Sequence, residues 1–446
     1  MSPVSPVSPS ERISSVDVIR VVALLGILLM NIVSFGLPGG AYMDPTIAGG
    51  ATGMNLAAWL INQVLFEGKM RAIFSMLFGA GAVILTARAE ERGGGGVIAD
   101  IYCRRNLWLL LFGLLHGYFL WEGDILYSYA LTALLLLYPL RKLAPKVLIA
   151  VGLLVLATQA PKNYLGGHEI DTLRDKARQA DAAAAAGKTL TEEQKEAQKA
   201  WTDKLKELKP DAAAIQKVID THRAGYWKLF AQRAGEVTGW NTGFFYRFGF
   251  WDTAGMMLLG MGLLKLGVFS AACSFRVYVW MALAGYGIGV PVNWWVGHVR
   301  VATNFEPAAF SYSFMTYDLG RLSVALGHIA LVMLVCKAGT LGWLTSRLAA
   351  VGQMALTNYL TDTLVATTLF YGYGFGLYGK LQRHQLYYVV ISIWIVQLIV
   401  SPIWLRHFRY GPAEWVWRSL TYWQRQPMRF AAPEPSGVPE ATPAGL

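Results

Sequence analysis

Ionisable residues lie inside apolar runs that are each long enough to cross a lipid bilayer. The clearest case is residues 109–140, LLLFGLLHGYFLWEGDILYSYALTALLLLYPL, where His116 and Asp124 fall in two adjacent apolar stretches. A charge or an imidazole in hydrocarbon is energetically costly, so such a residue usually faces the protein interior and serves a function. The sequence therefore predicts an integral membrane protein with a polar interior site.

Composition supports a membrane class. The 446 residues are 54% hydrophobic and 15% charged, whereas soluble proteins carry about 25% charged residues. A spanning helix needs about 20 mainly apolar residues. We predict an all-α, polytopic transmembrane helical bundle of about ten spans: 16–35, 70–87, 107–121, 125–140, 147–160, 248–264, 277–295, 319–336, 351–370 and 386–405.

Changes in composition suggest five parts of the chain. Residues 161–238 are rich in Ala, Lys, Glu and Gln, which are strong helix formers, and predict a helical insertion outside the membrane. The five parts are a flexible N-terminal tail (1–15), a first transmembrane half (16–160), the insertion (161–238), a second transmembrane half (239–405) and a basic tail (406–446).

The formal net charge of +11 is concentrated in short loops and the C-terminal tail. Cytoplasmic loops of membrane proteins carry an excess of Lys and Arg, and long loops translocate regardless of their charge. We therefore expect both termini to be cytoplasmic and the insertion to be periplasmic. This distribution indicates membrane topology rather than nucleic-acid binding, and the sequence contains no metal-binding spacing and no phosphate-binding loop.

The start of the first span carries an acid beside basic residues. In RISSVDVIRVVALLGILLMNIV, Asp17 and Arg20 are three residues apart, Arg12 precedes them, and Asn31 lies within the span. Residues at this spacing share one helical face. Arg20, with Asp17 on the same face, suits a phosphate-bearing ligand, and Asn31 is a candidate for stabilising an oxyanion. The alternative is a helix start whose charges reach the headgroups.

Three further constellations could carry acid–base chemistry. His116 and Asp124 flank a short turn between two spans, so they can form a base and its orienting carboxylate. Glu67, next to Lys69 in FEGKMRAIFSMLFGAG, enters an apolar span. It suits a base or substrate clamp, and a local ion pair is the equal alternative. His328, with Asp318 and Arg321 earlier in its span, indicates a proton relay or a hydrogen bond to a neighbouring helix.

The C-terminal part combines a polar span with a basic, Trp-rich tail. Span 351–370 contains Asn358 among many hydroxyl residues, which predicts a ligand-lined face. The tail arginines Arg406, Arg409 and Arg418 suit a phosphate-bearing ligand or anionic lipid. The alternative is a topology signal with interfacial tryptophans.

Several of these segments resemble one family. R-x4-D-x2-R with ALLGILLMN, then FEGKMRAIFSMLFGAG, GLLHGYFLWEGDIL, GQMALTNYL, YGYGFGLYG and GPAEWVWRSLTY resemble the YeiB-like family of bacterial inner-membrane proteins, a domain of unknown function. The resemblance covers nearly the whole chain outside the tails and the insertion. It implies a multi-pass protein of the bacterial inner membrane.

The family is similar, at greater distance, to transmembrane acyltransferases such as the lysosomal heparan-α-glucosaminide N-acetyltransferase. That similarity implies acyl-CoA as co-substrate and no metal. In the shared motif, D-x2-R-G, this chain has Val21 in place of the glycine, and it lacks a histidine shortly after the first span. The resemblance therefore assigns no catalytic histidine, and His116 is our candidate from its own setting.

Two functions follow as hypotheses. The first is an acyltransferase that moves an acyl group from cytoplasmic acyl-CoA to a periplasmic or envelope acceptor, which is a small molecule or a glycan. The second is a proton-coupled transporter or exporter of a small polar or amphipathic solute. We expect membrane lipids as partners and leave a homo-oligomer open.

Overall fold

A computed structural model describes residues 14–91, 96–339 and 341–430. Arg12, nearly all of the predicted N-terminal tail and the end of the predicted C-terminal tail lie outside these residues. The described elements are all helices, with one isolated bridge between Phe408 and Arg429. The prediction of an all-α bundle is confirmed.

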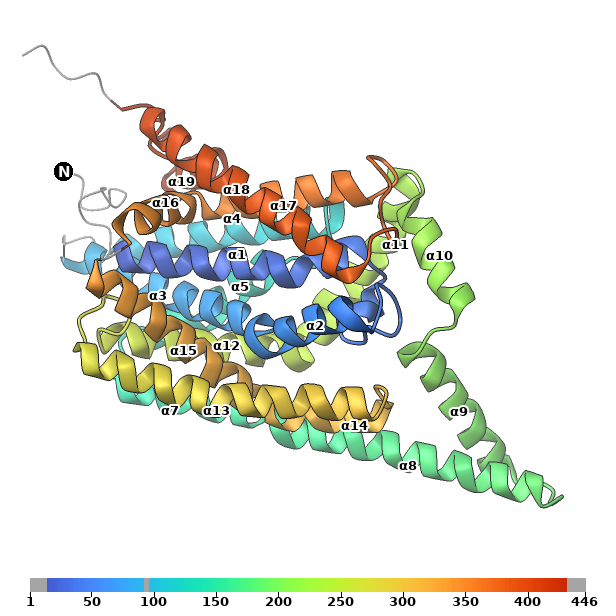
Figure 1. Cartoon of the computed structure of the whole chain (residues 1–446). Coiled ribbons are helices and arrows are strands. Elements are labelled where there is room, and N and C mark those ends of the chain that lie inside the picture. Colours follow the sequence, from blue (N-terminus) through green and yellow to red (C-terminus); the bar gives the residue numbers. More distant parts are fainter. Residues whose placement is uncertain (1–13, 92–95, 340, 431–446) are drawn as a thin grey trace, which may run out of the picture.

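The first half of the chain forms long helices and a hairpin outside the bundle (Figure 1). Its elements are α1 (Ser14–Gly36), η2 (Gly39–Tyr42), α2 (Gly53–Ile61), η3 (Asn62–Phe66), α3 (Lys69–Glu91), α4 (Ile98–Phe119), α5 (Leu126–Thr132), η4 (Ala133–Leu137), α6 (Tyr138–Leu140), α7 (Pro145–Ala157), α8 (Gln159–Ala185), α9 (Glu192–Leu208), α10 (Ala212–His222) and α11 (Tyr226–Gly239).

The second half returns to the bundle. Its elements are η5 (Trp240–Gly249), α12 (Phe250–Lys265), α13 (Phe275–Ala302), α14 (Pro307–Tyr312), η6 (Ser313–Thr316), α15 (Tyr317–Ala338), α16 (Gly342–Gln353), α17 (Ala355–Phe370), α18 (Arg383–His407) and α19 (Pro412–Tyr422). Three stretches, η3, η4 and η5, are π-helical, a form that often occurs at functional positions.

Six helical stretches in the described part of the chain are long and apolar enough to cross a membrane. They are Ser15–Gly36, Gly53–Glu91, Pro145–Ala185, Phe275–Ala302, Pro307–Ala338 and Arg383–His407. The other predicted spans correspond to shorter or more polar helices. Leu126–Leu140 is a shorter apolar helix, α12 and α17 have 16 residues each, and α4 carries Arg104, Arg105 and His116 among its apolar residues.

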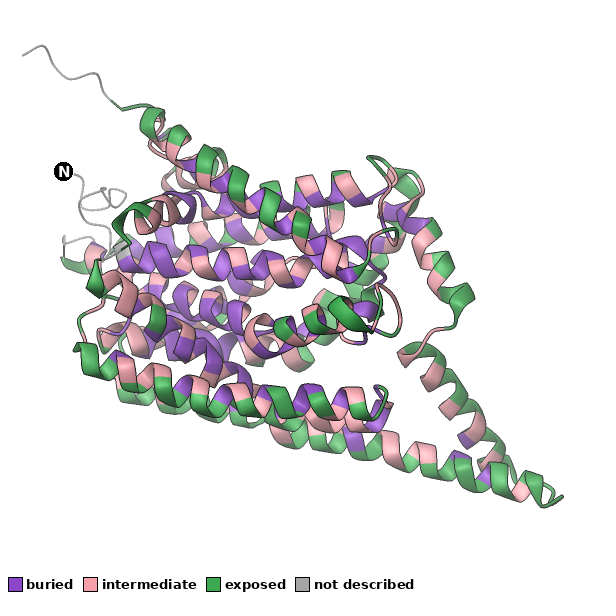
Figure 2. Cartoon of the chain, viewed as in Figure 1, coloured by how far each residue is buried: buried purple, intermediate pink, exposed green. Residues whose placement is uncertain are grey.

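Burial separates a central helix from peripheral ones. The most apolar stretch of α1 is 67% buried, whereas those of α13 and α18 are only 17% and 22% buried. Figure 2 shows the same contrast, with α1 largely purple and α13 largely green. Trp280, Leu283 and Ile288 on α13 are exposed. Large apolar side chains on the surface of a helix fit contact with lipid, because the bilayer core contains no water.

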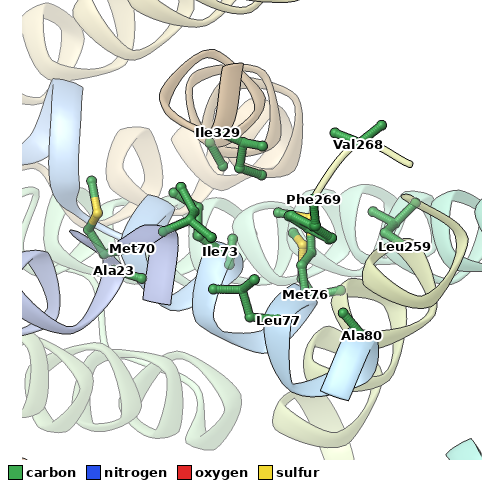
Figure 3. Packing of buried hydrophobic residues seen from close by; sticks show 14 of the residues in the cluster. Ala23, Met70, Ile73, Met76, Leu77, Ala80, Leu259, Val268, Phe269 and Ile329 are labelled. Carbon is green, nitrogen blue, oxygen red and sulfur yellow. The ribbon is translucent and has the colours of Figure 1, made fainter. Parts of the chain in front are cut away.

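Small residues bring α3 and α12 into close contact. A Cβ on Gly260 would lie 1.8 Å from the Met76 carbonyl oxygen, and one on Gly79 would lie 2.1 Å from that of Met257. Figure 3 shows Met76 and Ala80 of α3 beside Leu259 of α12. The small residues of the two helices thus serve packing, as expected for helices that meet in a membrane.

The predicted insertion is helical, but its boundary falls inside a helix. α7 and α8 form one continuous stretch to Ala185, so residue 160 is not a break. α9 packs against α8 through ion pairs such as Lys176–Glu193. Thr191 caps α9 in a capping box with Gln194, and Pro210 separates α9 from α10. Figure 1 shows α8 and α9 extending beyond the other helices.

The segment predicted as a basic tail packs back onto the bundle. α18 ends at His407 and α19 contacts α4 and α17. Glu414 explains the return, because its carboxylate accepts hydrogen bonds from the backbone N–H groups of Leu356 (2.6 Å) and Thr357 (3.1 Å). These amides are at the start of α17, where helical N–H groups lack partners. α19 therefore lies at the same end of the bundle as the start of α1 (Figure 1).

Candidate functional site

His116 and Asp124 meet directly in the interior. The His116 Nδ1 atom lies 2.9 Å from Asp124 Oδ1, and Nε2 lies 2.9 Å from the Thr363 hydroxyl. The His116 and Asp124 side chains are 1% and 5% exposed. The predicted pairing of the two residues is confirmed. A carboxylate on one ring nitrogen fixes the tautomer and orientation of the imidazole.

Local sequence explains how the pair forms. α4 ends at Phe119 and α5 begins at Leu126, so a short turn brings Asp124 back toward His116. Asp124 Oδ2 accepts a hydrogen bond from the Tyr127 amide in the first turn of α5 (2.8 Å). A Cβ on Gly113 would lie 2.3 Å from the Tyr127 nitrogen. The absence of a side chain at Gly113 thus lets α4 and α5 approach closely.

A cavity of about 270 Å³ opens at the end of the bundle where α1 begins. We call it the arginine cavity, because its lining includes Arg20, Arg88, Arg105 and Arg418. The acidic residues in its lining are Asp17 and Glu414. Its deeper walls are apolar and comprise Leu24, Ile27, Phe74, Leu77, Phe78, Leu109, Ile125 and Leu126.

The arginines of the cavity differ in their partners. Arg20 pairs with Asp17 at 2.5 Å. Arg105 lies over the Trp417 ring at 4.2 Å and Arg418 over the Tyr410 ring at 4.8 Å. Within residues 14–91, 96–339 and 341–430, neither Arg105 nor Arg418 has a carboxylate at ion-pair distance. Arginine is always charged and binds phosphate in a bidentate manner, so the two guanidinium groups favour an anionic ligand.

Glu414 does not neutralise the positive charge of Arg105 or Arg418. Its Oε1 accepts the two α17 amides, and its Oε2 accepts the Thr357 hydroxyl at 2.5 Å. Burial raises the pKa of Glu414 above its ordinary value, while these hydrogen bonds lower it. The carboxyl group is thus occupied in holding α19 against α17 instead of pairing with a cavity arginine.

Tyr359 separates the cavity from His116. Its ring lines the cavity, and its centroid lies 5.0 Å from that of the His116 ring. Among the described residues, neither His116 nor Asp124 lines the cavity. The His116–Asp124 pair therefore does not face the arginine cavity, because the Tyr359 ring fills the space beside the imidazole.

Glu67 belongs to a second polar region, which we call the ion network. It comprises Glu67, Lys69, Arg71, Asp252, Arg300, Asp318 and Arg321. Asp318 pairs with Arg321 at 2.6 Å, Asp252 pairs with Arg321 as well, and Arg71 approaches Asp252 at 3.6 Å. Glu67 accepts a hydrogen bond from the Tyr317 hydroxyl at 3.2 Å. It forms no local ion pair with Lys69, whose amine donates to the Gln63 carbonyl and to Asn293 Oδ1.

The remaining predicted residues are dispersed. Asn31 lies farther along α1 than Arg20 and is not among the cavity-lining residues. The buried Asn358 donates to the Val351 carbonyl and the Ser401 hydroxyl, which ties α16 and α18 to α17. Arg406 is exposed and Arg409 lies over the Phe430 ring. Of the three tail arginines, the structure brings only Arg418 to the cavity.

His328 is held by two hydrogen bonds. Its Nδ1 lies 2.8 Å from the Tyr286 hydroxyl, and its Nε2 lies 2.8 Å from the Leu65 carbonyl oxygen. Both ring nitrogens are therefore engaged in hydrogen bonds. The alternative interpretation, a hydrogen bond to a neighbouring helix, therefore matches its environment.

Sequence reasoning missed several members of these two regions. Arg105, Arg300 and Asp252 were not singled out. A signal for Arg105 was its position next to a long apolar run, while Arg300 gave none beyond its place near the end of a span.

In the described part of the chain, no group of three or more His, Cys, Asp or Glu side chains is arranged to hold a metal ion.

Comparisons with known proteins agree with the resemblance noted above. A family model described as "Protein of unknown function (DUF418)" matches residues 263–424. The chain is 33% identical over 422 residues to the uncharacterized protein YeiB of Escherichia coli (strain K12), covering 92% of this chain and 96% of YeiB. It is 31% identical over 447 residues to the uncharacterized protein YxaH of Bacillus subtilis (strain 168), covering 96% and 98%. No solved structure matches. The chain belongs to the YeiB-like family of proteins of unknown function.

Proposed function

We propose that the protein is a membrane-embedded acyltransferase that takes its acyl group from acyl-CoA. The observation that carries the proposal is the arginine cavity, which joins a cationic mouth to apolar walls and ends at Tyr359 beside His116. An acyl-CoA has the same polarity, with phosphates at one end and an apolar chain at the other.

The donor would bind with its phosphates at Arg20, Arg105 and Arg418. Ligand pockets for drug-sized molecules have volumes of about 300–1,000 Å³. At about 270 Å³, the arginine cavity suits the acyl-thioester part, and the nucleotide would remain at the mouth. Leu24, Leu77 and Leu109 would contact the acyl chain.

His116 would act as the general base, oriented by Asp124. The acceptor hydroxyl or amine attacks the thioester carbonyl carbon, and the carbon–sulfur bond breaks. The proton of the acceptor passes to His116 and from there to the CoA thiolate, so the imidazole is regenerated. Contact between His116 and the thioester requires the Tyr359 ring to move aside. The Thr363 hydroxyl, beside Nε2, would stabilise the developing oxyanion.

We infer the topology from the placement of the arginines. The chain would cross the bacterial inner membrane about ten times, with both termini cytoplasmic and α8–α11 periplasmic. The support is that basic residues such as Arg104, near the start of α4, and Arg141, just after α6, share an end of the bundle with the start of α1 and with α19. A cysteine at Lys188, in the α8–α9 turn, should react with an impermeant thiol reagent in intact cells. Labelling only after lysis would overturn this topology.

The donor proposal is tested by ligand-induced stabilisation of the purified protein. A ligand at 100 times its Kd stabilises the folded state by about 2.7 kcal/mol. We expect CoA and acyl-CoA to raise the melting temperature, and Arg20→Ala or Arg105→Gln to reduce the rise. An unchanged melting temperature at saturating CoA would remove the main support for acyl transfer.

A second candidate function is proton-coupled transport of a small polar or amphipathic solute. The ion network supports it, because ionisable residues buried in a membrane bundle often form proton pathways. Uptake or efflux in vesicles that follows an imposed pH gradient, without any acyl transfer, would favour this function. Acyl transfer that persists without a gradient would favour the first.

A further inference from the structure

Arg300 presents a preorganised guanidinium group in the ion network. Its carbon lies 4.5 Å from the Phe310 ring centroid and 4.9 Å from that of Phe314, and its Nε donates to the Ser313 hydroxyl at 2.9 Å. The residue is 1% exposed. Both Nη atoms are buried without a hydrogen-bond partner. The side chain is therefore held in place by one edge while its other donors remain unused.

The charges around Arg300 do not match. Arg71 and Arg321 are matched by Asp252 and Asp318 through the pairs described above. This leaves one carboxylate, Glu67, for two basic groups, Lys69 and Arg300, and in the described residues no ion pair forms with either. Glu67 Oε2 is also buried without a partner. A buried charge without a partner is strongly destabilising, so an anion at this position would resolve the mismatch.

Asn293 and Tyr317 connect the parts of this site. Asn293 lies seven residues before Arg300 on α13, which places both on one helical face, and it accepts the Lys69 amine at 2.8 Å. The Phe314 ring that covers Arg300 lies 5.6 Å from the Tyr317 ring, whose hydroxyl donates to Glu67. Arg300, Lys69 and Glu67 therefore belong to one connected cluster at the end of the bundle opposite the arginine cavity.

We propose that Arg300, with Lys69, binds a carboxylate or phosphate group of a ligand. The two free Nη atoms match the two oxygens of such an oxyanion, which is the geometry of a bidentate pair. Glu67 Oε2 would accept a hydrogen bond from a hydroxyl or amine next to the anionic group. The site thus fits a small solute or headgroup that carries an oxyanion beside a hydrogen-bond donor. It does not depend on the acyl-CoA proposal.

The test measures anion-dependent stabilisation of the full-length protein in detergent at constant ionic strength. Sodium acetate and sodium phosphate serve as probes and sodium chloride as the reference. We expect acetate or phosphate to raise the melting temperature above the chloride value. Arg300→Gln should weaken the response about tenfold or more in concentration, since hydrogen bonds to charged groups contribute about 1.5–3 kcal/mol. Equal responses of the wild type and Arg300→Gln would overturn the proposal, and so would a wild type that responds neither to the free anions nor to vesicles of anionic phospholipid.

Two controls keep the result interpretable. Arg105→Gln alters the arginine cavity alone, so it should lose the CoA response and keep the acetate response. Arg300→Gln should do the reverse, which separates failure of this site from failure of the acyl-CoA proposal. If Arg300→Gln does not fold, Arg300→Lys keeps the charge and removes the planar donor pair, and an unchanged acetate response in that variant would contradict the proposal. A response to vesicles of anionic phospholipid but not to the free anions would identify a lipid headgroup as the source of the group.

Discussion

The arginine cavity and the ion network place the same kind of residue in opposite settings. In the arginine cavity, Arg105 and Arg418 lie over aromatic rings at an open mouth and have no carboxylate at ion-pair distance in the described chain. In the ion network, Arg321 is 1% exposed and pairs with Asp252 and Asp318. An arginine that has matched acids holds the bundle together, whereas an arginine without them has unused capacity for a ligand.

The largest effect should come from removing a matched arginine. Arg321→Ala removes the partner of Asp252 and Asp318. Breaking such a buried ion pair typically lowers the free energy of unfolding by about 3–5 kcal/mol. We expect a large fall in the melting temperature of the purified protein. Arg178→Ala, an exposed position on α8, is the matched control and should change stability by less than about 0.5 kcal/mol. Similar melting temperatures for both variants would contradict the distinction between arginines that are paired with acids and arginines that are not.

The next effect concerns His116, which packs against Tyr359 in the lining of the arginine cavity. His116→Ala should reduce acyl transfer from acyl-CoA about 100-fold or more, the contribution typical of a general base. Asp124→Asn should reduce it less. The measurement is transfer of a labelled acyl group in membrane vesicles.

His328→Ala provides the matched control for that prediction. Both ring nitrogens of His328 are hydrogen-bonded, and neither His328 nor its partners line the arginine cavity, so a folded His328→Ala variant should retain acyl transfer. Full activity of His116→Ala would contradict the assignment of the base. Loss of pH-driven transport in both histidine variants would instead favour the transporter.

A smaller effect should follow from Glu414, whose oxygens are engaged by α17. Glu414→Ala leaves the amides of Leu356 and Thr357 without a partner, and each unsatisfied group costs about 1–3 kcal/mol. Glu414→Gln retains one acceptor oxygen and should lose less. Chemical unfolding in detergent would measure both, with the exposed Glu196→Ala on α9 as control. Equal stability of all three variants would show that α19 is held by other contacts.

The smallest effect is a pH dependence at the turn before α5. Burial raises the pKa of Glu122 to about 7 from 4.5, with Arg233 opposing the shift and Glu236 adding to it. A carboxyl group whose folded-state pKa is raised favours folding at low pH, and this contribution is lost as pH rises through 7. Because 28% of the Glu122 side chain is exposed, we expect a shift of only a few degrees in melting temperature.

Glu122→Gln tests this pH dependence. The variant should have a flatter stability profile than the wild type between about pH 5 and about pH 8, and it should gain relative stability above pH 7. Parallel profiles would contradict the assignment to Glu122. His116 also lies close enough to influence the pKa of Glu122, so the stability profile of His116→Ala should be measured alongside.

Apolar run lengths and local motifs allowed much of the fold to be predicted. The 16–35 span and the helical character of the insertion follow from short-range patterns. The His116–Asp124 pair was also predictable, because a short turn fixes the distance between neighbouring helices. The return of α19 was not, since it depends on a contact between Glu414 and Leu356, 58 residues apart in sequence.

The arginine cavity was only partly predictable for the same reason. Asp17 and Arg20 share one helix face, so their pairing follows from spacing. Arg105 and Trp417 meet across 312 residues, and nothing in either local segment specifies the other. The separation of His116 from the cavity was not predictable, because Tyr359 comes from α17 and its packing on His116 depends on tertiary contacts.

The most direct test of the central claim is a density map of the purified protein with added acyl-CoA. We predict density for the phosphates beside Arg20, Arg105 and Arg418, and for the acyl chain along Leu24, Leu77 and Leu109 toward Tyr359. Arg105→Gln, prepared in the same way, should lose this density. An empty arginine cavity at saturating acyl-CoA, or acyl-CoA bound only elsewhere on the protein, would contradict the account.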